Sequence, residues 1–150
     1  MVVTGHMSQL IFWSHFAATF YMCGLVAFVH GVHYPMFANI PKDAFAAYEA
    51  IHLKRSGAVI VPYMLLEAAT GLVLIFSMPE IIVAPNFFFA SLAALAVVWL
   101  VTFTWSVPMH ARLEGGFDPK AHASLMRSNL VRVLFWALRG VLLIFSVLSA

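Results

Sequence analysis

Two opposite charges lie near the centres of two long hydrophobic stretches of the sequence. Glu67 is in the middle of GAVIVPYMLLEAATGLVLIFS, residues 57–77, and Arg139 is near the middle of residues 129–148. An isolated charge at the centre of a bilayer costs roughly 3 kcal/mol or more, so intramembrane charges usually face a partner or a cavity. We therefore predict that the two helices face each other and that Glu67 pairs with Arg139.

Two further polar residues are expected in this site. Arg132 shares the helix face of Arg139, and Tyr63 lies one helical turn from Glu67. One interpretation is a structural ion pair that sets the register of the helices, because a broken buried pair leaves an uncompensated charge. The other is a ligand-binding or proton-handling site. The spacing of the residues is compatible with both.

Histidines form a second group of candidate functional residues. The first hydrophobic stretch carries a stripe at three- and four-residue steps, made of His15, Thr19, Met22, Val26, His30 and His33. Such spacing keeps side chains on one face of a helix. That face is expected to look into a helix bundle, because histidines pointing at lipid are costly. His30, His33 and His110 are expected to gather near one membrane surface, with Arg132 and His52 close by.

Imidazole is a good ligand for Zn, Cu and Fe, so these histidines are candidate cofactor ligands. One haem can be held near His30 or His33 with His110, whereas a chlorophyll-type pigment needs a single histidine such as His15 or His30. A quinone is a third candidate. The alternative is that all four are hydrogen-bonded core or interfacial residues. The sequence has no nucleophile–base arrangement, phosphate loop or paired carboxylates, so it assigns no catalytic residue and no particular metal.

Four hydrophobic stretches must position these residues. Of the 150 residues 63% are hydrophobic and 9% are charged, against roughly 45–50% and 25% in soluble domains. Each stretch comes near the roughly 20 residues that span a bilayer as a helix. The predicted spans are about residues 10–31, 57–77, 87–107 and 129–148. The sequence therefore predicts one all-α domain, a four-transmembrane-helix bundle, and its net charge of +2 does not suggest nucleic acid.

Two longer loops are expected to connect these spans, because Pro35 and Pro108 should end the first and third helices. Each loop is predicted to carry a short amphipathic helix, at residues 41–55 and 120–128. In the first, Asp43 and Glu49 come early and Lys54 and Arg55 come late, as the helix dipole prefers. Its aromatic face consists of Phe45, Tyr48 and His52. We expect this helix to lie on the membrane surface.

The basic residues outside the span centres all belong to one side of this arrangement. They are Lys42, Lys54, Arg55, Arg112, Lys120, Arg127 and Arg132. The other side, formed by both termini and the turn at residues 78–86, has none. The positive-inside rule therefore predicts that both long loops are cytoplasmic and that both termini are on the non-cytoplasmic side.

Several loop motifs carry a resemblance to a known group. The first set is Tyr34-Pro35-x-Phe37, Phe45, Tyr48, Arg55, Pro62 and Glu67, and the second is Val107-Pro108-x-His110-x-x-Leu113-x-x-Gly116-Phe117-Asp118, His122, Leu125, Asn129 and Arg132. With these residues the chain resembles an uncharacterised group of small four-span bacterial inner-membrane proteins. The resemblance implies a bacterial inner-membrane location with polar motifs in the cytoplasmic loops, and it implies no activity.

The lack of a complete catalytic set favours a non-enzymatic role. We expect an accessory or structural subunit of a larger membrane complex, in contact with the lipid bilayer and with other subunits or copies of itself. It would also contact pigment or quinone. The alternative is a small membrane redox protein or enzyme that binds a haem, metal or quinone through bundle His, Glu and Arg residues.

Overall fold

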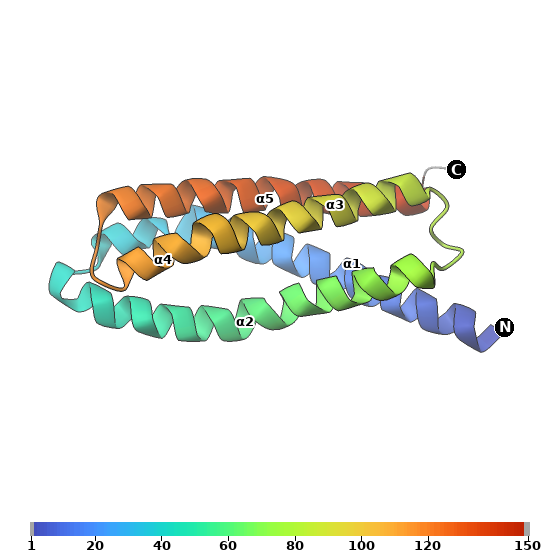
Figure 1. Ribbon diagram of the computed structural model, residues 1–150, viewed down its shortest axis with the longest axis horizontal. Coiled ribbons are helices and arrows are strands. Elements are labelled where there is room, and N and C mark those ends of the chain that lie inside the picture. Colours follow the sequence, from blue (N-terminus) through green and yellow to red (C-terminus); the bar gives the residue numbers. More distant parts are fainter. Residues whose placement is uncertain (1, 149–150) are drawn as a thin grey trace.

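The computed structural model describes residues 2–148 as four long helical rods that run side by side (Figure 1). The first rod is α1 (Val2–Phe28), continued by a π-helical turn η1 (Val29–His33) and a 3-10 turn η2 (Pro35–Asn39). The second is α2 (Lys42–Phe76). The third is α3 (Pro85–Val101), a π-helical turn η3 (Thr102–Ser106) and α4 (Val107–Leu113), and the fourth is α5 (Pro119–Leu148). The predicted all-α four-helix bundle is confirmed.

All four rods are long and apolar enough to cross a membrane, so the chain is a multi-pass membrane protein. α5 packs against α1 and α3, and α1 packs against α2. Figure 1 shows both termini and the α2–α3 connection at one end of the bundle. The other two connections lie at the opposite end, which we call the basic end because Lys42, Arg112 and Lys120 lie beside these connections.

The connections at the basic end are shorter than the sequence suggested. Of the predicted residues 41–55, residues 42–55 are helical, but they belong to α2 and extend it along the bundle instead of forming a separate helix. Residues 120–128 likewise form the first part of α5. The reason is packing, because Phe45 is fully buried in a core cluster with Phe37 and Leu125.

Neither Pro35 nor Pro108 ends its rod. Pro35 is the first residue of η2, and Pro108 is the second residue of α4, one position after the end of η3. The first position of a helical segment needs no backbone N–H donor, so proline fits there. At η3 the N–H of Val107 bonds to the carbonyl of Thr102, which is the wider π-helical spacing. The chain therefore stays helical through both prolines, and the spans are longer than predicted.

Candidate functional site

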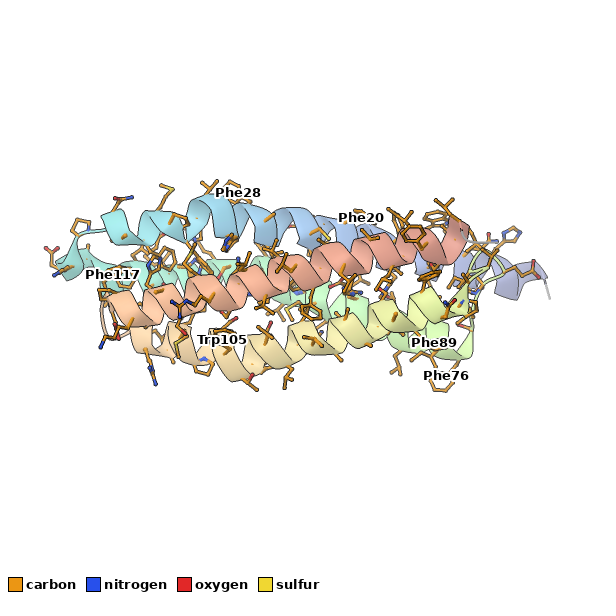
Figure 2. The ribbon with its side chains drawn as sticks, turned by 90° about the horizontal axis from the view of Figure 1, so that it is seen from above. Phe20, Phe28, Phe76, Phe89, Trp105 and Phe117 are labelled. Carbon is orange, nitrogen blue, oxygen red and sulfur yellow. The ribbon has the colours of Figure 1, made fainter. Side chains whose placement is uncertain are left out.

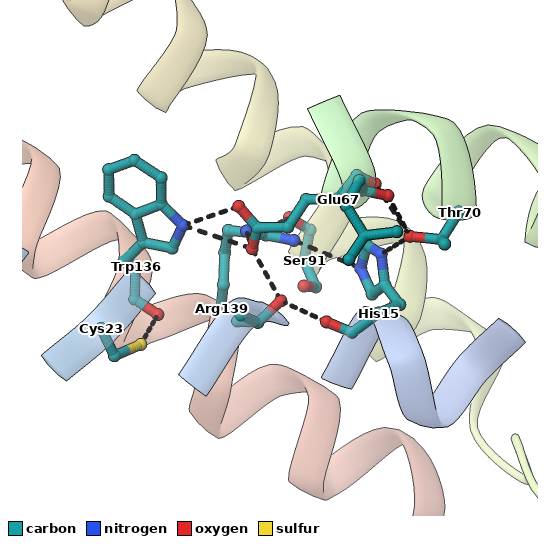
Figure 3. A network of polar contacts seen from close by, with 9 residues as sticks. His15, Cys23, Glu67, Thr70, Ser91, Trp136 and Arg139 are labelled. Atoms are coloured by element: carbon teal, nitrogen blue, oxygen red, sulfur yellow. Dashed lines mark hydrogen bonds and ion pairs between the residues drawn. The ribbon is translucent and has the colours of Figure 1, made fainter. Parts of the chain in front are cut away.

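The predicted pair lies inside the bundle, where Glu67 of α2 meets Arg139 of α5 (Figure 3). The Glu67 and Arg139 side chains are fully buried, and Arg139 Nη1 donates a hydrogen bond to Glu67 Oε1. Arg139 Nε donates to the Ser91 carbonyl oxygen at 3.2 Å. The pair therefore joins α2, α3 and α5.

Glu67 has two additional donors. Thr19 Oγ1 donates to Oε1 at 2.8 Å, and Trp136 Nε1 donates to Oε2 at 3.1 Å. Both carboxylate oxygens are thus hydrogen bonded, which buried charges require. Because Thr19 is on α1, the Glu67–Arg139 network connects all four rods of the bundle.

His15 extends this network, and its neighbours fix its tautomer. Arg139 Nη2 is 3.2 Å from His15 Nε2. A guanidinium group only donates hydrogen bonds, so Nε2 accepts and Nδ1 carries the proton. His15 Nδ1 then donates to Thr70 Oγ1 at 2.8 Å, and the Thr70 hydroxyl donates to the Leu66 carbonyl oxygen. Both ring nitrogens of His15 are therefore engaged within the protein, as in the core interpretation of this residue.

The other two residues predicted for this site lie beside the network. The Tyr63 ring stacks on Tyr21 with a centroid distance of 4.0 Å, so it packs between α2 and α1. The Arg132 guanidinium carbon is 5.3 Å from the centroid of the Trp136 ring, a cation–π contact. Arg132 thus adjoins the Glu67–Arg139 network through Trp136.

The network depends on a close approach of helices at Gly71. A Cβ atom there would lie 2.9 Å from Leu92 Cδ2 and 3.3 Å from His15 Cε1. We expect Gly71→Val to lower the free energy of unfolding in detergent by about 1–3 kcal/mol, because overpacking displaces these side chains. Gly24→Ala is the control, since a Cβ at Gly24 has no atom within 4 Å. Equal stability of the two variants would contradict the close approach.

A second cluster of chemically active side chains lies toward the basic end. Glu49 and His52 of α2 and His110 of α4 each offer one metal-ligating atom, and these atoms lie within 4.8 Å of one another. His110 Nδ1 is 2.6 Å from Glu49 Oε1, where the ring N–H donates to the carboxylate. We call these three residues the His₂Glu cluster.

Glu49 is the unusual member of the His₂Glu cluster. Its side chain is fully buried, and its Oε2 has no hydrogen-bond partner among the described residues. The large majority of buried side-chain polar atoms are hydrogen bonded, so such an oxygen calls for a specific explanation. Glu49 precedes His52 by three residues, which places both on the face of α2 that packs into the bundle.

Neighbouring residues orient the two histidines. His33 Nε2 is 2.9 Å from His52 Nδ1, and the Tyr34 hydroxyl is 2.9 Å from His110 Nε2. The π-helical turn η1 ends at His33 and brings His33 and Tyr34 over α2 and α4. His122 Nε2 pairs with the Tyr34 carbonyl oxygen at 2.8 Å, which ties this turn to α5.

The structure therefore brings together some of the predicted cofactor ligands and leaves others apart. His33 and His110 lie at the same cluster, with His52, as expected. His30 lies apart from it, and its buried Nδ1 has no partner among the described residues. Glu49 is not among the predicted site residues, because the helix dipole already accounts for an acidic residue early in the predicted loop helix. The available signal was the Glu49-x-x-His52 spacing.

Two imidazoles and one carboxylate are a set of ligands suited to a divalent transition-metal ion. The same combination holds zinc in some hydrolases, and as a facial triad it holds Fe(II) in non-haem oxygenases. In both cases positions on the metal stay open for water, oxygen or substrate.

No family model, curated protein or solved structure matches this chain.

Proposed function

We propose that this protein is a small membrane metalloprotein that binds a divalent transition-metal ion through Glu49, His52 and His110. The observation that carries this proposal is the fully buried Glu49 carboxylate, which lies beside two imidazoles and whose Oε2 has no partner in the part of the chain that the structure describes. A metal ion would supply the missing partner and would offset the buried negative charge. Both ring nitrogens of His110 have protein partners, Glu49 Oε1 and the Tyr34 hydroxyl, so the ion would replace one of these two contacts. His33 would act as the outer partner that orients a ligating histidine, a common feature of metal sites.

The bound metal would supply open coordination positions, where an iron ion binds oxygen or substrate and a zinc ion binds water. The residues around the metal ion would determine which molecules reach the ion. The cluster is built into a bundle whose outer surface is rich in exposed Leu, Ile, Val and Phe side chains. A substrate that arrives through the bilayer, rather than from water, fits this surface best.

The charge distribution supports a location in a bacterial cytoplasmic membrane, with the basic end in the cytoplasm and both termini on the other side. In this orientation the His₂Glu cluster would lie near the cytoplasmic surface. The proposed location also agrees with the resemblance to small four-span bacterial inner-membrane proteins.

Elemental analysis of the detergent-purified protein tests the proposal. We expect about one iron, zinc or manganese ion per chain after reconstitution with each metal in turn. His110→Asn is expected to lose the ion, whereas His6→Asn, at the far end of the bundle, should retain it. A wild-type protein that binds none of these metals stoichiometrically would overturn the proposal.

An accessory subunit of a larger membrane complex is a second candidate, and one observation favours it. The polar residues at the bundle centre bind one another, so the Glu67–Arg139 network holds helices together without offering a ligand site. Stoichiometric co-migration with a larger complex after mild solubilisation would support this role. A stable, isolated chain with a bound metal ion would count against it.

A further inference from the structure

A pocket of about 390 Å³ lies between the α1–η1 rod and α2, directly beside the His₂Glu cluster. His33 and His52, which are hydrogen bonded to each other, both line it. The volume is within the roughly 300–1,000 Å³ of typical small-molecule sites. A small molecule in the pocket can therefore reach His33, the residue that links η1 to the His₂Glu cluster.

The outer part of this pocket is apolar and exposed. Phe28 of α1 is 57% exposed, and Ile51 and Val59 of α2 are 55% and 43% exposed. Figure 2 shows Phe28 on the outer side of α1. In a membrane-spanning bundle such a surface faces acyl chains, so the pocket opens sideways toward lipid. A molecule dissolved in the bilayer can enter it without crossing water.

The polar part of the pocket consists mainly of hydrogen-bond donors. Its wall carries the His33 imidazole, the Tyr48 phenol and the Arg55 guanidinium, and it contains no carboxylate. His52 also lines the pocket, but its Nδ1 is already paired with His33. The Ser56 hydroxyl is already used, because it donates to the His52 carbonyl oxygen at 2.7 Å. Donors of this kind are matched by an occupant with oxygen acceptors.

Aromatic rings narrow the class of occupant further. The rings of Tyr48 and His52 are nearly parallel, with an interplanar angle of 6° and a centroid distance of 6.5 Å. Phe28, Tyr34 and His33 also line the pocket. Flat walls of this kind favour a flat ring, which can stack on them or contact their edges.

We infer that this pocket binds a lipid-soluble quinone. The quinone carbonyl oxygens would accept hydrogen bonds from the His33 and Arg55 side, and the apolar tail would leave between Phe28 and Val59 into the bilayer. This inference deepens the proposed function, on which it rests, by naming the class of molecule that approaches the metal cluster.

Binding of a short-chain quinone, decyl-benzoquinone, to the purified protein tests the inference. We expect saturable binding of about one molecule per chain. Val59→Trp should weaken it at least about tenfold, because the indole fills the pocket from its lipid-facing side. Val73→Trp is the matched control, since Val73 has the same 43% exposure on the same helix and lies outside the pocket. Arg55→Gln should weaken binding by about tenfold through loss of a charged donor, and Lys54→Gln should leave it unchanged.

Metal content is measured on the same samples, so the two proposals can fail separately. Val59→Trp with full metal content and weaker quinone binding supports the pocket as the quinone site. If the wild type binds metal but not quinone, or if both tryptophan variants bind quinone equally, the inference is overturned and the metal site stands. If Val59→Trp binds quinone more weakly than Val73→Trp but the protein binds no metal ion, only the metal proposal fails. Competition by palmitate at equal concentration would overturn the choice of a quinone.

Discussion

Arg139→Ala is expected to lower the free energy of unfolding by about 3–5 kcal/mol, because it leaves the buried Glu67 carboxylate without its charged partner. The guanidinium also donates to the Ser91 carbonyl oxygen and to His15, so these groups lose their partners as well. Unfolding in detergent mixtures, followed by Trp fluorescence, measures the effect. Arg112→Ala is the control, since this exposed arginine should change stability by less than about 0.5 kcal/mol.

A double-mutant cycle separates the pair from the rest of the network. Glu67→Gln alone leaves Arg139 buried and unpaired, so it should also destabilise the bundle. Arg139→Met is the second single variant, and Glu67→Gln combined with Arg139→Met removes both charges. The cost of the double variant should be smaller than the sum of the costs of these two single variants by about 0.5–3 kcal/mol. Strict additivity of the two substitutions would show that the carboxylate and the guanidinium contribute independently, against the geometry of Figure 3.

The Glu67–Arg139 network could be predicted in part because a charge in the middle of a hydrophobic stretch needs a partner or a cavity. Glu67 and Arg139 are at similar depth, and depth follows directly from sequence position. The partners His15, Thr19 and Trp136 depend on helix rotation and side-chain rotamers. Helical periodicity placed His15 on the inward face, but it did not specify which nitrogen meets Arg139.

The His₂Glu cluster was harder to predict for a physical reason. Glu49 lies near the end of a span, where a charged side chain can reach water at little cost. A charge at this position therefore does not indicate a buried site. An amphipathic segment such as residues 41–55 can bury its apolar face in the membrane surface or in a bundle, and the periodicity is the same for both. The π-helical turns η1 and η3 lie next to Pro35 and Pro108 in rods that stay helical, and His33 and His110 of these rods contact this face.

Glu49→Gln is expected to abolish stoichiometric metal binding while leaving the fold of the metal-free protein intact. The amide has nearly the same shape as the carboxylate, and its oxygen can still accept the hydrogen bond from His110 Nδ1. It lacks the negative charge that makes a carboxylate a strong ligand for a divalent ion. In the metal-free protein the substitution also removes a buried carboxylate whose Oε2 has no partner within residues 2–148. We therefore expect a change in unfolding free energy of less than about 2 kcal/mol.

The combination of the two measurements identifies the role of Glu49. A residue kept for binding should be dispensable for the stability of the metal-free protein, because functional sites often retain groups that the fold does not need. Glu114→Gln is the matched control at the same end of the bundle, since its exposed carboxylate should affect neither metal content nor stability. A Glu49→Gln protein that keeps its metal ion would remove Glu49 from the ligand set. Severe destabilisation without any bound metal would instead make the His110–Glu49 contact a structural link between α2 and α4.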